Sequence, residues 1–325
     1  MTIQRRRFLK LAGAGLAMPA VARLAHAQGY PARQVRLIIG YPPGGSADIT
    51  ARLVSQWLSE RLGQPFIVES RAGGGTNIAT ETVINAPPDG YTLLLVAPAN
   101  AINATLYEKL NHVFLRDIVP IAGLIRFPNV VVVNPSVPVN SIPELIAYAK
   151  ANPGKLNMAS SGNGSTIHMS GELFKMMTGV NMIHVPYRGG ALALTDLVGG
   201  QVQVMFDNIP TAMEFVRSGK LRGLAVTGAA RSETLPDLPT VADFLPGYEA
   251  TSWYGLGAPK GTPAEIIDKL NREVNAILAD PKTKARFAEL GATLLSGSPA
   301  DFGKLVADET EKWGKVVKFS GAKVT

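Results

Sequence analysis

Cysteine is absent from all 325 residues of the chain. Disulfide bonds, thiolate metal sites and a cysteine nucleophile are therefore excluded. A chain without thiols also suits an oxidising compartment, because it offers no cysteine that could be oxidised wrongly.

Histidine is scarce as well, with four residues in the chain. His112, His168 and His184 are isolated and form no H-E-x-x-H motif, so we expect no metal site. Ser165 precedes His168 by three residues, which is a spacing that could suggest a nucleophile and its base. Because no nearby acid is placed to orient the imidazole, we expect Ser165 to cap a helix and predict no catalytic residues.

Apolar runs long enough to span a bilayer, about 20 residues, are also absent. The run at 11–21 is short and is interrupted by glycine and proline. It follows Arg5-Arg6-Arg7 and Lys10 and ends in Ala25-His26-Ala27, which is the pattern of a cleaved secretory signal. Residues 5–10 also resemble a twin-arginine export signal, with Gln4 where Ser or Thr is usual. We expect residues 1–27 to be removed after Ala27 and the mature chain to be periplasmic.

A strong charge of either sign is lacking once this leader is set aside. The whole chain has 32 Lys and Arg against 25 Asp and Glu. The leader contains five of the basic residues and no acidic one, which leaves 27 against 25. A nearly balanced chain has no basic footprint for nucleic acid, so we expect no nucleic-acid partner.

Short apolar runs alternate with helical patterns from residue 35 to residue 226. Predicted strands cover 35–39, 66–69, 92–97, 130–133, 156–159, 182–185, 202–206 and 221–226, and predicted helices cover 47–62, 77–85, 142–151, 166–177, 191–198 and 210–218. Apolar residues are bunched in these strands, as in strands covered on both faces. The alternation predicts βαβ units and an α/β fold with parallel sheets.

The C-terminal third is mostly helical, with expected helices at 263–278, 281–290 and 299–319. Pro263, Pro281 and Pro299 follow Thr, Asp and Ser, which is a helix-start signal. The 298 residues after the leader exceed what one core usually holds, so two lobes are expected. Because no linker divides them, the chain should cross between the lobes more than once. The extended segments 127–135 and 253–259 are the candidate crossovers.

Three glycine-rich segments each follow a predicted strand and open a predicted helix. They cover 41–48, 71–77 and 160–166. Glycine lets backbone N–H groups approach a ligand, and the first N–H groups of a helix have no partner within it. Such helix ends attract anions. Simple tight turns are the alternative, but three such loops at the carboxyl ends of strands favour a binding site.

More specific sites do not fit these loops. Ile167 stands where the third glycine of a dinucleotide fingerprint belongs, and none of the loops contains the Gly-Lys-Ser/Thr of a P-loop. A G-x-S-x-G elbow is also missing. Among the acids, Asp48 is explained by the helix dipole in a first turn. Asp207 directly follows the strand 202–206 and is the better candidate for a ligand contact.

Longer motifs follow one another along the chain. They are Tyr41-Pro42-Pro43-Gly44-Gly45-Ser46-Ala47-Asp48, Arg71-Ala72-Gly73-Gly74-Gly75, Pro88-Asp89-Gly90-Tyr91-Thr92-Leu93-Leu94, Pro186-Tyr187-Arg188-Gly189, Leu235-Pro236-Asp237-Leu238-Pro239-Thr240-Val241 and the stretch 253–263. In this order the chain resembles the Bug family, the extracytoplasmic receptors of tripartite tricarboxylate transporters. The motifs extend over essentially the whole mature chain. Gly73-Gly74-Gly75 departs from the Pro-Gly-Ala-Gly type of loop that relatives often have.

This resemblance implies a type II periplasmic-binding-protein fold. Two doubly wound α/β lobes would close on a ligand in the cleft between them. Residues 28–126 with 252–325 would form the first lobe, and residues 127–251 the second. The resemblance implies no cofactor and a monomer.

It also implies that a carboxylate is held by backbone N–H groups and ordered water at two helix N-termini. In the first lobe the implied ligand-binding residues are Tyr41, Gly44, Gly45 and Ser46, with Asn100 as a further candidate. In the second lobe they are Ser161, Gly164, Ser165, Thr166, His168, Tyr187, Arg188 and Asp207, with Gly189 beside them. Since the loops at the helix ends lack Lys and Arg, aligned dipoles would hold the anion.

The implied function is a solute-binding receptor that captures a small carboxylate and presents it to the permease subunits of a tripartite tricarboxylate-type transporter. A dicarboxylate, a tricarboxylate, an acidic amino acid or an aromatic acid would share the same anchored end. A ligand-sensing subunit of a membrane signalling kinase is an alternative with the same sequence requirements. A cleft hydrolase is a distant alternative, because no set of nucleophile, base and orienting acid is visible.

Overall fold

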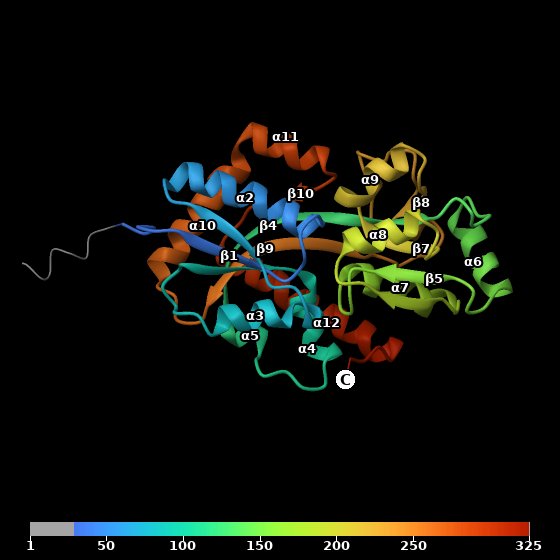
Figure 1. Ribbon diagram of the computed structural model, residues 1–325, viewed down its shortest axis with the longest axis horizontal. Coiled ribbons are helices and arrows are strands. Elements are labelled where there is room, and N and C mark those ends of the chain that lie inside the picture. The colour runs from blue at the N-terminus through green and yellow to red at the C-terminus, as the bar shows by residue number, and fades with distance from the viewer. Residues whose placement is uncertain (1–28, 325) are drawn as a thin grey trace, which may run out of the picture.

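The computed structural model of the chain describes residues 29–324. The predicted signal at 1–27 therefore lies outside the described residues. Helices cover both faces of a curled, ten-stranded mixed sheet (Figure 1). The strand order is β2-β1-β3-β9-β4-β7-β5-β6, and β8 and β10 pair with β4.

The first part of the sheet consists of β1 (Val35–Ile39), β2 (Phe66–Ser70) and β3 (Thr92–Val96), which are parallel. Leu37 faces a core that includes α2 (Ser46–Leu62), α10 (Ala264–Ala279) and α11 (Pro281–Glu289). Ile38 faces the opposite core with α3 (Asn77–Ile84) and the start of α12 (Pro299–Ser320). The bunched apolar runs thus supply both faces, as strands covered on both sides require.

The second part is built in the same way around β5 (Asn157–Ser160), β6 (Ile183–Pro186), β7 (Val204–Asn208) and β8 (Arg222–Val226). Phe206 faces a core with α6 (Ile142–Ala151) and α7 (Thr166–Thr178). Met205 faces a core with α8 (Gly190–Val198) and α9 (Ile209–Arg217). In Figure 1 these elements occupy the right-hand half of the molecule.

Two long strands connect the parts. β4 (Ile118–Val133) pairs with β9 (Thr251–Pro259) through its first half and with β7 and β8 through its second half. The segments 127–135 and 253–259 were predicted as crossovers, but β4 begins nine residues earlier than the first of them. Pro120 lies near a shift in register, which is where a proline is tolerated within a strand.

Several short elements were not predicted. They are α4 (Pro98–Leu106), α5 (Phe114–Asp117), β10 (Thr293–Leu294) and the 3₁₀ turns η2 (Gly74–Thr76) and η3 (Val241–Asp243). Of these, α4 matters most for function, because Pro98 at its first turn borders the cavity described below.

The C-terminal helix α12 packs against both parts. Phe302 belongs to a core of the first part, whereas Trp313 belongs to a core of the second part together with Leu106 of α4. Between them lies Glu309, which is buried and accepts hydrogen bonds from the indole N–H groups of Trp253 (3.2 Å) and Trp313 (2.8 Å). The last turns of α12 thus pack on the second part, although 252–325 was assigned to the first lobe.

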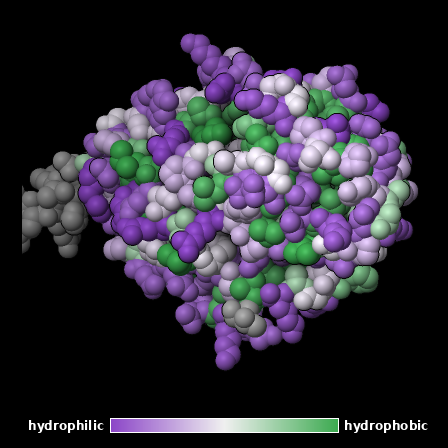
Figure 2. Space-filling model, turned by 45° about the vertical axis from the view of Figure 1, so that its right-hand side comes forward, coloured by the Kyte–Doolittle hydropathy of each residue, from purple (hydrophilic) through white to green (hydrophobic). Residues whose placement is uncertain are grey.

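The surface is mostly polar on the face in Figure 2, where hydrophobic residues occur in small separate groups. Within residues 29–324, no helix combines the length and the apolar character that crossing a membrane requires.

Candidate functional site

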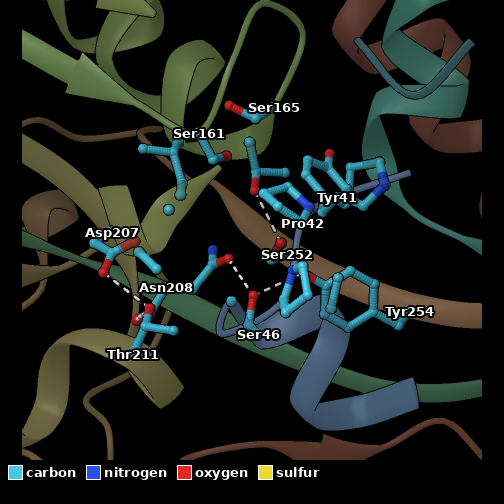
Figure 3. A pocket seen from close by; sticks show the side chains of 18 residues that line it. Tyr41, Pro42, Ser46, Ser161, Ser165, Asp207, Asn208, Thr211, Ser252 and Tyr254 are labelled. Atoms are coloured by element: carbon cyan, nitrogen blue, oxygen red, sulfur yellow. Dashed lines mark hydrogen bonds between the residues drawn. The ribbon is translucent and has the colours of Figure 1, made fainter. Parts of the chain in front are cut away.

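A cavity of about 480 Å³, its open mouth included, lies where the two parts of the molecule meet. Its walls come from the loop after β1 and the start of α2, from the loop between β5 and α7, and from the C-terminal end of β7 and the first half of β9 (Figure 3). The lining residues are Tyr41, Pro42, Pro43, Gly45, Ser46, Ala47, Pro98, Ser161, Ser165, Thr166, Ile167, Gly190, Ala191, Asp207, Asn208, Thr211, Ser252 and Tyr254.

The N-terminus of α2 opens into this cavity without a side-chain cap. Its N-cap is Gly45, in an extended conformation (φ −91°, ψ 172°), and glycine offers no oxygen to the first N–H groups of the helix. The carboxylate of Asp48 accepts from the backbone N–H of Gly44 (3.1 Å) and pairs with Arg52 (2.9 Å). Asp48 is therefore engaged in holding the loop, and the helix end remains available to an anion.

The start of α7 forms the facing wall and is capped by its own sequence. Ser165 accepts from the backbone N–H of His168 (3.2 Å) and donates to the carbonyl of Gly162 (2.8 Å). The predicted capping role of Ser165 thus agrees with its contacts. Because the hydroxyl meets the backbone of His168 and not its imidazole, the pair lacks the arrangement of a nucleophile and a base.

The floor of the cavity is formed by the C-terminal end of β7 and the first half of β9. Asp207 is fully buried, and its Oδ2 accepts from the hydroxyl of Thr211 (2.9 Å). Its Oδ1 has no hydrogen-bond partner among residues 29–324. Burial raises the pKa of Asp207 to about 7, against the opposing effects of the hydrogen bonds from Thr211 and the backbone of Asn208.

One hydroxyl connects the two walls directly. Ser46 Oγ lies 2.7 Å from Asn208 Oδ1 and 2.7 Å from the hydroxyl of Tyr254 (Figure 3). Asn208 Nδ2 donates to Asn129 (2.6 Å), which leaves its oxygen as an acceptor for Ser46. Ser46 therefore donates to Asn208 and accepts from Tyr254, and it joins the first part of the molecule to the second.

The described residues that line the cavity include no Lys, Arg or His. Burial raises the pKa of Tyr41 and of Tyr254 well above the usual tyrosine range, so both phenols are neutral. Asp207 is the one carboxyl group in the lining. Helix N–H groups, hydroxyls and amides are thus the groups that could hold an anion here, as the sequence suggested.

The predicted site residues divide into two groups. Those that line the cavity are Tyr41, Gly45, Ser46, Ser161, Ser165, Thr166 and Asp207. Those that do not are Gly44, Asn100, Gly164, His168, Tyr187 and Arg188.

Asn100 has a structural role. Its Oδ1 accepts from the backbone N–H of Ala97 (2.8 Å) at the start of α4, and its Nδ2 donates to Thr80 (2.8 Å). Both the oxygen and the nitrogen of the Asn100 amide are therefore engaged in hydrogen bonds that join α4 to α3. This role was missed because α4 itself was not predicted.

His168 lies behind the loop that forms the second wall. Its ring stacks on His184 at 3.9 Å, and its Nδ1 accepts from the backbone N–H of Gly164 (3.3 Å). Burial lowers the pKa of His168 to about 3, so the ring is neutral, as an acceptor must be. His168 and Gly164 thus shape the loop from behind and do not face the cavity.

Tyr187 and Arg188 line a second, wider cavity that adjoins the first. It lies between the loop 72–76 and the segments 161–163 and 186–188, and it shares Tyr41 and Ser161 with the first cavity. The hydroxyl of Tyr187 donates to Asp196 (2.7 Å). Arg188 is exposed and makes no ion pair within the described part of the chain.

The sequence analysis did not single out several polar lining residues, notably Asn208, Thr211, Ser252 and Tyr254. Asn208 could have been found, because it directly follows Asp207 at the end of the same strand. Ser252 and Tyr254 could not, since the alternation of β9 that turns them toward the cavity and Trp253 toward α12 depends on its pairing.

Replacing Ser46 by alanine is expected to weaken ligand binding about 5- to 30-fold, because the contact between the two walls loses a hydrogen bond and leaves the oxygen of Asn208 without its donor, at a cost of about 1–2 kcal/mol. Ser55→Ala is the matched control on the same helix, because the buried Ser55 hydroxyl has no hydrogen-bond partner within residues 29–324. Titration calorimetry of both variants provides the measurement. Equal affinities for the two variants would show that the Ser46 contact does not contribute to ligand binding.

The family described as "Tripartite tricarboxylate transporter family receptor" matches residues 50–322. Protein BugT from Bordetella pertussis is 38% identical over 321 residues, which cover 98% of each chain. The solved structure of R. palustris Rpa4515 with adipate has 41% identity and a TM-score of 0.88, and it covers 90% of this chain and 98% of its own. MatC (Rpa3494) from Rhodopseudomonas palustris, with bound malate, has 32% identity and a TM-score of 0.84. The match covers 89% of this chain and 100% of the MatC chain.

These comparisons confirm the expected fold class, since the similar structures are two-lobed periplasmic receptors. The resemblance inferred from the sequence motifs is confirmed as well.

Proposed function

This chain belongs to the family of tripartite tricarboxylate transporter receptors, and on that premise we propose that it captures a small dicarboxylate in the cavity between its lobes. Two similar proteins of known structure, Rpa4515 with adipate and MatC with bound malate, contain dicarboxylates without an amino group. The receptor would present this ligand to the permease subunits of its transporter.

The observation that supports this proposal most is the uncapped N-terminus of α2 in the cavity wall. Its first N–H groups face a space without a basic side chain, and Gly45 leaves the approach to them open. A carboxylate placed there would supply the missing acceptors and would benefit from the helix dipole. In a closed space of low dielectric, such dipoles bind an anion strongly without an ion pair.

The second cavity offers room for the far end of the ligand. It shares Tyr41 and Ser161 with the first cavity, and Arg188, which makes no ion pair within residues 29–324, borders it. We propose that Arg188 and Tyr187 lie beside the distal carboxylate of a longer dicarboxylate. The second carboxylate would then distinguish a dicarboxylate from a monocarboxylate of the same length.

A close contact between Gly189 and Pro42 supports a closing motion of the lobes. Gly189 has φ +147°, and a Cβ on it would lie 2.4 Å from Cγ of Pro42 in the opposite lobe. Only glycine allows this close approach. We propose that the lobes open and close about β4 and β9, with this contact broken in the open form.

We further propose that the lobes comprise residues 28–126 with 252–325, and residues 127–251. The chain would be exported by the twin-arginine route, cleaved after Ala27 and act as a periplasmic monomer. A ligand-sensing subunit for a membrane kinase would use the same cavity, and co-purification of the membrane partner would distinguish the two functions.

Titration of the mature chain, residues 28–325, with adipate, malate, glutamate and acetate tests the proposal. We expect adipate or malate to bind and to stabilise the protein by about 2.7 kcal/mol at 100 times the dissociation constant. Adipamide is the matched control, because it keeps the length of adipate but has no charge. Binding of adipamide as tight as that of adipate, or no binding of any carboxylate to ligand-free protein, would contradict the proposal.

A further inference from the structure

Asp207 is an unusual group in a cavity proposed to bind anions. It is fully buried at the end of β7, and its Oδ1 has no partner in the described part of the chain. A Cβ built on Gly190 would lie 3.8 Å from this oxygen and 3.9 Å from Cβ of Ser161, and both of these residues line the cavity. The orphaned oxygen is therefore directed toward the ligand space (Figure 3).

Within residues 29–324, Asp207 makes no ion pair, and the cavity lining contains no basic side chain that could neutralise a negative charge on it. Of the titratable groups in the lining, Tyr41 and Tyr254 are neutral phenols. On the surrounding elements, Asp48 pairs with Arg52 on α2, Glu172 with Lys175 on α7, and Glu214 with Arg217 on α9. Further along α2, Glu60 accepts from Gln56, and Arg61 pairs with Glu273 of α10. On α8, Asp196 accepts from Tyr187, and on α7 the buried His168 is neutral. On β4, the Nε of Arg126 is buried and has no hydrogen-bond partner within residues 29–324, and Arg126 lies opposite Trp253 of β9 in the sheet.

An ionised Asp207 and a ligand carboxylate in this space would repel each other, because both are negatively charged and little water is present to screen them. A protonated carboxyl has one O–H donor, and an O–H group that donates to a carboxylate forms a short, strong hydrogen bond. In the complex, the ligand oxygen would then be the hydrogen-bond partner that Oδ1 lacks in the described part of the chain.

Resting on the proposed function, we propose that Asp207 binds the ligand as a neutral carboxylic acid and donates a hydrogen bond from Oδ1 to a ligand carboxylate. Where Asp207 is ionised in the free protein, binding takes up one proton from solvent: the carboxylate of Asp207, a proton and the dicarboxylate combine into one complex. Asp207 is then a specificity-determining residue, since the neutral acid accepts a plain dicarboxylate, whereas an ammonium group on an acidic amino acid would require the ionised form.

The expected pH dependence has a definite sign. Burial raises the pKa of Asp207 in the free protein to about 7, and the bound anion raises it further. Below about pH 7 the acid is already protonated, so affinity is at its maximum. Above that pH the proton must be taken up on binding, and the dissociation constant should increase by up to about tenfold per pH unit.

The test is titration calorimetry of the mature chain with adipate from about pH 6 to about pH 8.5, in buffers of different ionisation enthalpy. The carboxylates of adipate are ionised throughout this range, so its own titration does not interfere. We expect an affinity that falls above about pH 7 and an uptake that approaches one proton per adipate bound. Affinity that does not change with pH, or release of a proton, would overturn the proposal.

Two variants separate this effect from a structural role of the side chain. Asp207→Asn keeps an N–H donor but cannot titrate, so its affinity for adipate should be independent of pH and should exceed that of the unmodified protein at about pH 8.5. Glu214→Gln, an exposed acid on α9, should keep the original pH dependence. If Asp207→Asn does not fold, the number of protons that the unmodified protein takes up with adipate still tests whether Asp207 binds as a neutral acid. Binding of adipate without proton uptake overturns this inference alone, whereas failure of every carboxylate at every pH contradicts the proposed function.

Discussion

Gly45→Val is expected to raise the dissociation constant for a dicarboxylate by about 100-fold or more while leaving the protein folded. A Cβ on Gly45 would meet no heavy atom within 4 Å, and φ −91° with ψ 172° is an extended conformation open to any residue. The valine side chain would therefore fit the folded protein. Its methyl groups would, however, stand at the start of α2, where the carboxylate must approach the backbone N–H groups.

Calorimetry with adipate and a melting curve without ligand give the two measurements for this variant. Gly45→Ala is the graded comparison, because its single methyl group should weaken binding less than the two methyl groups of valine. A valine variant with unchanged affinity would show that the carboxylate does not bind at this helix end. A variant with lost affinity and a strongly lowered melting temperature would show that Gly45 has a structural role.

Glu309→Ala is expected to lower the free energy of unfolding by about 3 kcal/mol, because it leaves two buried indole N–H groups without an acceptor and opens a cavity on α12. Trp253 on β9 and Trp313 on α12 both depend on this carboxylate. Urea denaturation followed by tryptophan fluorescence measures the change, since both indoles report on their surroundings.

Glu311→Ala is the matched control on the same helix. Glu311 is exposed and pairs with Lys315 on the surface (2.8 Å), so its removal should change stability by less than about 0.5 kcal/mol. Glu309→Gln should fall between the two, because its amide oxygen can still accept from one indole. Equal stabilities of the Glu309 and Glu311 variants would show that the tryptophan contacts contribute little.

Much of the fold could be predicted from the sequence, because local patterns determine it. Residues such as Leu37 and Ile38 lie next to each other in a bunched apolar run, and the structure buries them in different cores on opposite faces of one strand. The helix starts at Pro281 and Pro299 follow from the capping residues Asp280 and Ser298, whose side chains accept from backbone N–H groups. Such features depend on neighbours in sequence.

What could not be predicted depends on partners far away in sequence. The first half of β4 contains Pro120, which argues against a strand unless the pairing with β9 is known. Similarly, α4 is short and contains Asn100 and Asn103, and its packing against α12 and α3 is what buries it. For this reason Asn100 was predicted to lie near a ligand, whereas in the structure its side chain bonds to Ala97 and Thr80.

The same reason explains the division of the predicted site. Tyr41, Gly45 and Asp207 lie at the carboxyl ends of strands, where a general rule of α/β sheets applies. Tyr187 and Arg188 are exposed to a different cavity by the path of the loop after β6, which no local pattern determines. His168 points away from the ligand space because it stacks on His184, sixteen residues further along the chain.

The alternation of β9 has a mechanical consequence. Ser252 and Tyr254 face the cavity, whereas Trp253 between them faces Glu309 and α12 on the other side of the sheet. In the opening motion that we propose about β4 and β9, movement on the cavity side of this strand would also disturb the contact of Trp253 with Glu309 on the other side. Substitutions at Trp253 or Glu309 would then shift the proposed balance between open and closed forms without contacting the ligand. Substitutions behind β9 would therefore change the affinity for the ligand, whereas the residues that line the cavity would determine which ligand binds.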